Sequence, residues 1–373
     1  MSADQGFVHL HVHTEYSMLD GAARVDELVT EVANQKMPAI AITDHGNVFG
    51  AYEFHKKAIK AGVKPIIGIE AYVAPESRFE KKRVKWADGG EDDVSGGGAY
   101  THMTLLAEDN VGLSNLFKLS SLASLEGYYY KPRMDRDLLS KYAKGIIATT
   151  GCPGGEIQTR LRMGAFKEAK AAASELRDIF GAENFYLEIM DHGIDIETRV
   201  KADLLKLGKE LGLPLLATND LHYTHHADAA SHEALLCVQS GSTLADPKRF
   251  KFDNNEFYLK SAQEMRTLFA EIPEACDNTL LIAERCNVTM RENENLLPQY
   301  PVPKGESEDS WLRSESNRGL RERLGGNVEA SYQERLDYEL EVMIKMGFPG
   351  YFLVVSDLCS HARSVGIRVG PGR

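Results

Sequence analysis

Phe7-Val8-His9-Leu10-His11-Val12-His13 forms the first apolar run of the chain, and this run ends in side chains that can bind metal ions. Six later apolar runs also end in residues that can hold a metal or orient one of its ligands: Asp44 and His45, Glu70, His102, Cys152, Asp191 and His192, and Asp220 and His222. The strands of a parallel barrel point their carboxyl ends at one rim, so side chains at the ends of many strands meet there. The pattern predicts one shared metal site and a metal-dependent enzyme.

Segments with helical periodicity separate the seven runs, at residues 25–35, 48–61, 113–124, 165–180, 196–211 and 227–238. Alternating strands and amphipathic helices indicate βα units around a parallel sheet. Seven such units predict an α/β fold of the distorted (β/α)7 barrel type, one unit short of the common eight. An open doubly wound sheet is the alternative, but it would gather its ligands near one crevice, whereas these candidates come from all along the chain.

Two polar stretches interrupt this rhythm. Residues 75–99 combine a basic run with glycine and acidic residues, which indicates a surface insertion. Residues 298–310 are typical of a connector, and amphipathic helices are predicted beyond it at 332–346 and 351–363. The loop-like ending, Gly370 to Arg373, leads us to expect a fragment of a longer protein.

The composition of the 373 residues, 43% hydrophobic and 26% charged, is that of a soluble globular protein. The sequence contains no apolar stretch of membrane-spanning length and no signal peptide, and its five irregularly spaced cysteines favour a reducing cytoplasm over a disulfide framework. We therefore expect a cytoplasmic protein without a membrane partner. The net charge of −12 argues against tight binding of duplex DNA by the chain alone, although a metal cluster could reverse that sign locally.

Each candidate ligand has a plainer alternative. Strand alternation places His9, His11 and His13 on one face, where an isolated motif could equally be a set of hydrogen-bonded core histidines. The nearby Asp20 and the later Asp220-Leu221-His222 motif favour the metal interpretation.

Glu70 lies in an apolar run, where its carboxylate needs a cation, either a metal or a buried Lys or Arg. Cys152 could be ordinary packing, but its place after a strand favours a ligand. The remaining histidines, at positions 192, 225, 226 and 232, are interpreted as surface groups or as groups that orient ligands.

The strong and moderate candidates number nine, which is too many for one ion and suits two or three ions. They are His11, His13, Asp20, His45, Glu70, His102, Cys152, Asp220 and His222. Mixed imidazole and carboxylate groups favour divalent transition metals, zinc or manganese first and then iron. Multinuclear sites of this kind stabilise in-line displacement at phosphorus. We expect His13, Asp20 and Asp220 to be central to catalysis.

These residues, in this order, resemble the polymerase and histidinol phosphatase (PHP) superfamily. The corresponding motifs are His11-Val12-His13, Thr43-Asp44-His45-Gly46, His102 and Asp220-Leu221-His222. The resemblance implies a distorted seven-stranded barrel with three metals. It also implies one ion on His11, His13, Glu70 and Asp220, a second on Asp20, His45 and His222, and a third on Glu70, His102 and Cys152.

The match extends to the family of bacterial DNA polymerase III alpha subunits through four stretches: FVHLHVHTEYSMLDG (7–21), GYYYKPR (127–133), YFLVVSD (351–357) and VGPGR (369–373). By this resemblance, residues 1–270 are the PHP domain and residues 271–373 begin the polymerase palm. The palm's catalytic aspartates would lie beyond Arg373, so this chain is not expected to synthesise DNA.

The resemblance further implies a metal-dependent 3′→5′ proofreading exonuclease. Its partners would be a DNA primer 3′ end and, through other parts of a longer protein, the sliding clamp and clamp loader. A catalytically silent PHP scaffold that stabilises the polymerase is the alternative, and a free small-molecule phosphatase is a third hypothesis. Within GYYYKPR, the residues Tyr130, Lys131 and Arg133 are candidates for DNA contact, with ordinary loop packing about as plausible.

Overall fold

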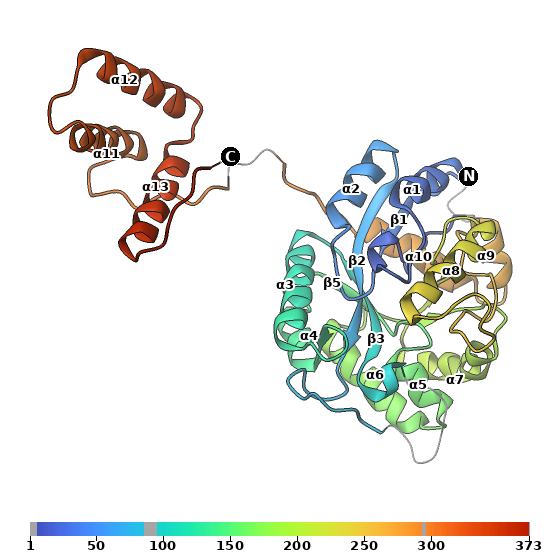
Figure 1. The fold of residues 1–373 in the computed structure, drawn as a ribbon. Helices are drawn as coiled ribbons and strands as arrows, with labels where there is room; N and C mark the ends of the chain where they lie inside the picture. The colour runs from blue at the N-terminus through green and yellow to red at the C-terminus, as the bar shows by residue number, and fades with distance from the viewer. Residues whose placement is uncertain (1–5, 86–94, 293–295, 373) are drawn as a thin grey trace. The chain divides into compact units, whose positions relative to one another are not determined.

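The computed structural model describes residues 6–85, 95–292 and 296–372 (Figure 1). The chain divides into two compact units, Met1–Met290 and Arg291–Arg373. Each unit has its own apolar core.

The first unit contains one 7-stranded sheet in the order β1-β2-β3-β5-β6-β7, with β4 paired to β2. The strands are β1 (Ala39–Ile42), β2 (Lys64–Val73), β3 (Thr101–Ala107), β4 (Arg133–Met134), β5 (Ile146–Thr149), β6 (Phe185–Ile189) and β7 (Leu215–Ala217). Six of the predicted apolar runs therefore form strands. The curled sheet with surrounding helices confirms the predicted α/β fold (Figure 1).

Helices follow most of the strands, and most of them cover the outside of the sheet. They are α1 (Val25–Asn34), α2 (Ala51–Lys60), α3 (Asn110–Glu126), α4 (Arg136–Tyr142), α5 (Glu156–Arg162), α6 (Phe166–Phe180), α7 (Asp195–Leu211), α8 (Ala229–Ser240), α9 (Ala262–Leu268) and α10 (Pro273–Arg285). The six predicted amphipathic helices correspond to α1, α2, α3, α6, α7 and α8. Helices α4, α5, α9 and α10 were not predicted, although some of their starts are visible in the sequence; Ser261, for example, forms a capping box with Glu264.

The first apolar run lies between β1 and the segment that follows β7, but it does not form a regular strand. The amide of Ala41 donates to the His9 carbonyl at 2.9 Å, and the amide of His13 donates to the Leu221 carbonyl at 2.7 Å. Val8 and Leu10 pack in one apolar cluster and Val12 in the other, so the alternation of side chains is interrupted between Leu10 and Val12. The ring of His9 lies 5.0 Å from that of Phe7, and its Nε2 lies 2.8 Å from the Lys260 carbonyl. The prediction that His9 shares a face with His11 and His13 is therefore wrong.

Strand alternation builds two apolar layers. Side chains at one parity, including Ala41, Ile66 and Leu106, pack together and against Ile282 of α10. Side chains at the other parity, such as Ile67, belong to the core shared with the outer helices. Side chains two residues apart on a strand point the same way. Further along the strands, the face that carries Ala41, Ile66 and Leu106 therefore carries polar residues; this face is called the inner face.

The packing of α10 also sets the limit of the first unit. Ile282, Ala283 and Cys286 complete the inner apolar cluster, so the chain remains part of the first unit as far as Met290. The boundary predicted at residue 270 therefore falls about 20 residues before the division seen in the structure. The functional identities proposed for the two units remain predictions.

Strand β3 runs antiparallel to both of its neighbours, β2 and β5, so the expectation of an all-parallel sheet is wrong at this strand. In the β2–β3 register, Glu70 faces Thr104 and Tyr72 faces His102. His102 lies near the beginning of its strand and not at its end. The reversal of β3 still brings His102 to the end of the sheet where β2 finishes.

The second unit contains α11 (Glu308–Arg323), α12 (Ala330–Lys345) and α13 (Pro349–Ser364), and α12 and α13 confirm the two helices predicted there. Leu312, Leu340 and Leu353 form its small core, one from each helix. Among the described helices no single one is long and apolar enough to cross a membrane, and one bent pair, α12 with α13, passes that test by length and composition alone.

Candidate metal centre

Four predicted ligands meet where the first run, β2 and the segment after β7 come together. His11 Nε2 lies 3.2 Å from His13 Nε2 and 3.4 Å from both Glu70 Oε1 and Asp220 Oδ1. His13 Nε2 lies 3.2 Å from Asp220 Oδ1 and 3.6 Å from Glu70 Oε2. The structure therefore brings together the four residues expected around one ion.

A second group lies beside the first. His45 Nε2 lies 3.0 Å from Asp20 Oδ2, and His222 Nε2 lies 4.0 Å from Asp20 Oδ1. The backbone turns directly after His45, where Gly46 has a φ of +65° and a Cβ would lie 2.8 Å from the Tyr72 ring. Glycine is needed at this turn for both reasons.

The third group contains the sulfur atom. His102 Nδ1 lies 3.0 Å from Glu70 Oε1, and Cys152 Sγ lies 3.2 Å from the same oxygen. Cys152 Sγ and His102 Nδ1 are 3.5 Å apart. The carboxylate of Glu70 also approaches His45 Nδ1 to 2.5 Å, so this one side chain contacts members of all three groups.

Several atoms in the cluster have close polar neighbours but no well-formed hydrogen bond, which is the arrangement that a cation would complete. Within the described residues, Asp20 Oδ1, His45 Nδ1, Glu70 Oε2 and Asp220 Oδ1 are buried without a well-formed hydrogen bond. Ligand atoms of three sets of residues here lie within 4.8 Å of one another. Nitrogen, oxygen and sulfur donors together fit a divalent transition metal better than calcium or magnesium. The residues therefore fit the metal that the sequence predicts.

The surroundings bias the protonation of the cluster. Burial, together with the neighbouring His45 and His222, lowers the pKa of His13 to about 3. Burial alone would raise the pKa of Glu70, but His102 and His45 bring it well below its usual range. The neutral imidazole of His13 and the ionised carboxylate of Glu70 are the forms that bind metal ions.

Two other members of the cluster hold protons that a metal would displace. Burial alone would lower the pKa of His45, but the carboxylates of Glu70 and Asp20 raise it to about 10. Burial, followed by the nearby carboxylates, raises the pKa of the Cys152 thiol. Metal binding would therefore release protons from this site.

Hydrogen bonds behind the ligands fix their orientation. Ser17 Oγ lies 3.0 Å from His13 Nδ1 and donates to Asp44 Oδ1 at 2.7 Å. His222 Nδ1 lies 2.7 Å from the Asp220 carbonyl, so its Nε2 faces the cluster. Asp44 ends one of the apolar runs, whereas nothing in the sequence pattern indicates an orienting role for Ser17.

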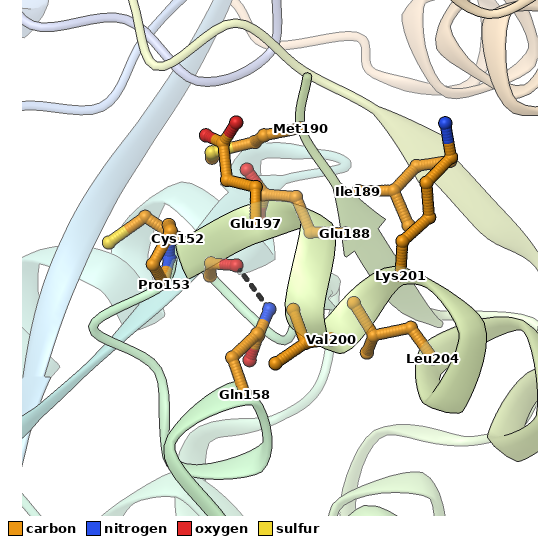
Figure 2. Close-up of a pocket in the computed structure, with 11 residues that line it drawn as sticks. Cys152, Pro153, Gln158, Glu188, Ile189, Met190, Glu197, Val200, Lys201 and Leu204 are labelled. Carbon is orange, nitrogen blue, oxygen red and sulfur yellow. Dashed lines mark hydrogen bonds between the residues drawn. The ribbon is translucent and has the colours of Figure 1, made fainter. Parts of the chain in front are cut away.

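The buried carboxylate of Glu188 was also missed, and it lies 2.6 Å from His11 Nδ1. Figure 2 shows Glu188, Cys152 and Gln158 among the residues that line a pocket beside β6, α5 and α7. The signal that could have identified Glu188 is a carboxylate inside an apolar run, the same signal that identified Glu70.

The histidines left open by the sequence have different roles. His232 Nε2 lies 2.7 Å from the Asp20 carbonyl, and His192 Nε2 lies 2.9 Å from the Asn219 carbonyl, so both contact the backbone of ligand segments. His225 pairs with Glu27 at the surface.

The three candidates for DNA contact are in different environments. Arg133 is buried, and its guanidinium donates to the carbonyls of Gly127, Ala99, Arg78 and Glu80. The prediction that Arg133 contacts a phosphate is therefore wrong, because its guanidinium is buried and bound to backbone carbonyls. Tyr130 is 58% exposed, and Lys131 Nζ lies 5.3 Å from the centre of the Tyr72 ring.

Comparison with known proteins defines the class. The family model described as the PHP domain matches residues 9–192, and the model described as the bacterial DNA polymerase III alpha NTPase domain matches residues 310–373. Two solved structures with similar folds are an amidohydrolase from Chromobacterium violaceum and a two-domain protein from Bacteroides vulgatus ATCC 8482 containing a predicted PHP-like metal-dependent phosphoesterase. The first is 14% identical with a TM-score of 0.38, covering 58% of this chain and 88% of its own. The second is 14% identical with a TM-score of 0.38, and the match covers 78% of this chain and 72% of the second protein. The first unit carries a PHP domain, because the PHP model matches residues 9–192 within it.

Curated relatives extend the match along the chain. The DNA polymerase III subunit alpha of Mycobacterium leprae (strain TN) is 57% identical over 98% of this chain and 32% of its own length. The subunits of Treponema pallidum (strain Nichols) and Thermus aquaticus are 42% and 40% identical over 100% of the chain, which covers 31% and 35% of them. The chain belongs to the bacterial DNA polymerase III alpha family, and it spans about a third of the length of these relatives.

Proposed function

We propose that the first unit is a metal-dependent phosphodiesterase that removes nucleotides from DNA 3′ ends, acting as a 3′→5′ proofreading exonuclease within a replicative DNA polymerase. One observation carries the proposal: nine donor side chains from distant parts of the sequence converge, and four of their buried atoms have no well-formed hydrogen bond within the described residues. The substrate would be a primer 3′ end. The sliding clamp and clamp loader would be partners through parts of a longer protein.

Bound divalent ions would lower the pKa of a water molecule to make it a nucleophile and would offset the charge of the phosphate. The chain would hold these ions through the three groups of ligands, which share the carboxylate of Glu70. His13, Asp20 and Asp220 each contact at least two of the other three histidines, His11, His45 and His222. We therefore assign His13, Asp20 and Asp220 the central roles in catalysis.

The activity assay uses the 373-residue chain with 3′-labelled single-stranded and mismatched primers, with added Zn²⁺ or Mn²⁺ and with a chelator. We expect release of 3′ nucleotides that depends on the metal. A chain with full metal occupancy and no cleavage of any primer would instead support the scaffold hypothesis. The complete set of donors does not favour that alternative.

The first prediction concerns metal content. We expect the purified chain to contain two to three divalent transition-metal ions, zinc or manganese with iron as the third option, because the ligands form three groups around Glu70. Elemental analysis measures the content, and less than one ion per chain under metal-replete conditions would contradict it. Removal of the metal should also lower the melting temperature, because metal binding energy is partly folding energy.

A second prediction concerns Lys131. The Tyr72 ring beneath its ammonium lies 5.2 Å from the His102 ring and 5.9 Å from the His45 ring, which places this cation next to the cluster. Lys131→Ala should raise KM for primers and reduce the slope of log affinity against log salt by about 1, as loss of one phosphate contact does.

Lys141 provides a matched control, because its ammonium also lies over a tyrosine ring, that of Tyr142 at 5.3 Å, on helix α4. Lys141→Ala should leave KM and the salt dependence unchanged. Equal effects of the two substitutions, or no effect of either, would show that Lys131 does not contact the substrate.

A further inference from the structure

Glu188 is a buried carboxylate in the middle of the apolar strand β6, between Leu187 and Ile189. Its two oxygens accept hydrogen bonds from hydroxyls on three other strands or strand ends. Thr218 Oγ1 donates to Oε1 at 2.7 Å, Thr104 Oγ1 donates to Oε2 at 3.3 Å, and Thr149 Oγ1 also donates to Oε2. These contacts hold the carboxylate in one orientation inside the sheet.

The same carboxylate meets the far side of a candidate metal ligand. Glu188 Oε1 lies 2.6 Å from His11 Nδ1, whereas His11 Nε2 faces Glu70 and Asp220 at 3.4 Å. A carboxylate is an acceptor only, so Nδ1 carries the proton of this hydrogen bond. The lone pair of neutral His11 is then on Nε2, which faces the cluster.

We propose that Glu188 is a positioning residue for the metal site of His11, His13, Glu70 and Asp220. Glu188 fixes the tautomer and ring orientation of His11. The role assigned to Glu188 rests on the proposed metal centre described above. A carboxylate that accepts the second N–H of a metal-binding histidine also makes the ligand nitrogen more basic. The threonine hydroxyls occupy the carboxylate, so Glu188 orients a ligand and is not a ligand itself.

The charge of Glu188 supports this role. Its hydrogen-bond and ion-pair partners within the described residues are His11 and threonine hydroxyls, and they include no Lys or Arg. A buried carboxylate needs a compensating positive charge. An ion held by His11 would provide that charge through the imidazole.

The test compares zinc affinity of the wild-type chain and the Glu188→Gln variant by competition titration with a chelating dye. Glutamine keeps the size of the side chain and can still accept from Nδ1, but it has no charge and can also present its NH₂ group to the ring. We expect a 10- to 100-fold loss of affinity at the site that contains His11, the range typical of such partners. Nitrogen NMR of the zinc-loaded wild-type chain should show His11 protonated at Nδ1 and bound through Nε2.

Asp135→Asn is the matched control, because Asp135 is also a buried carboxylate, but it pairs with Arg78 and caps α4. This control should leave zinc affinity unchanged. Thr218→Val removes only one hydroxyl from Glu188 and should cause a smaller loss of zinc affinity, which keeps the test valid if Glu188→Gln folds poorly.

Wild-type zinc affinity in a folded Glu188→Gln or Thr218→Val chain would overturn the positioning role and leave the metal centre intact. Absence of zinc binding by the wild-type chain itself would overturn the metal centre and this role together. The two failures are therefore distinguishable.

Discussion

Asp220→Asn should reduce 3′→5′ cleavage by orders of magnitude, while the circular dichroism spectrum and chromatographic behaviour remain those of the wild type. Asp220 Oδ1 lies 3.2 Å from His13 Nε2 and 3.4 Å from His11 Nε2, so its charge is at the centre of the first group of ligands. The amide has almost the same shape but lacks the negative charge that holds a metal. Asp220 also has a φ of +42°, a conformation that asparagine tolerates better than alanine does.

The control is the same substitution at the end of another strand. Asp191 follows the β6 segment but pairs with Lys201 at 3.3 Å and contacts none of the nine candidate ligands in the described structure. Asp191→Asn should retain cleavage. A folded Asp220→Asn chain that digests primers at the wild-type rate would mean that the nuclease lies elsewhere.

Arg133→Ala should destabilise the first unit by about 3 kcal/mol or more, because it leaves buried backbone carbonyls without a donor. The guanidinium of Arg133 joins Gly127 in the loop after α3 to the segments around Ala99 and Arg78. No water can replace it without access to this buried position. Calorimetry of the first unit, with the second unit as an internal reference, measures the loss.

Lys131→Ala serves as the comparison. Lys131 lies two residues before Arg133 and is half-buried, so its substitution should change stability by no more than about 0.5 kcal/mol, as surface substitutions do. Arg133→Lys keeps the charge, but the lysine cannot reach all the carbonyls. The loss of stability should therefore lie between those of Arg133→Ala and Lys131→Ala. An Arg133→Ala chain as stable as the wild type would show that the carbonyls find other donors.

The sequence predicted most of the sheet because apolar runs of strand length are a local signal, as in residues 65–69 and 185–190. It did not predict the direction of β3, since direction depends on how two strands are connected. A clue was present nevertheless. The segment between Glu70 and His102 has no amphipathic helix, and a parallel crossover needs a dozen or more residues that are usually helical.

Most of the candidate ligands could be predicted because they are metal-type side chains at or near one end of an apolar run, and the structure brings all nine together. Their role as ligands stays a prediction. Glu188 was missed, although it has the same signal as Glu70, because its partner, His11, is far from it in the sequence. The prediction that Arg133 contacts DNA was wrong because nothing local in GYYYKPR shows that its last residue begins a buried strand.

The antiparallel pairing of β2 with β3 makes the connection between them, residues 74–100, start and finish at the end of the sheet that carries the metal centre. Its length can change without altering the register that opposes Tyr72 to His102 and Glu70 to Thr104. None of the nine candidate ligands lies in this connection, so the ligand set and the connection are encoded in separate stretches of sequence. One can therefore change in length or composition while the other is inherited unchanged.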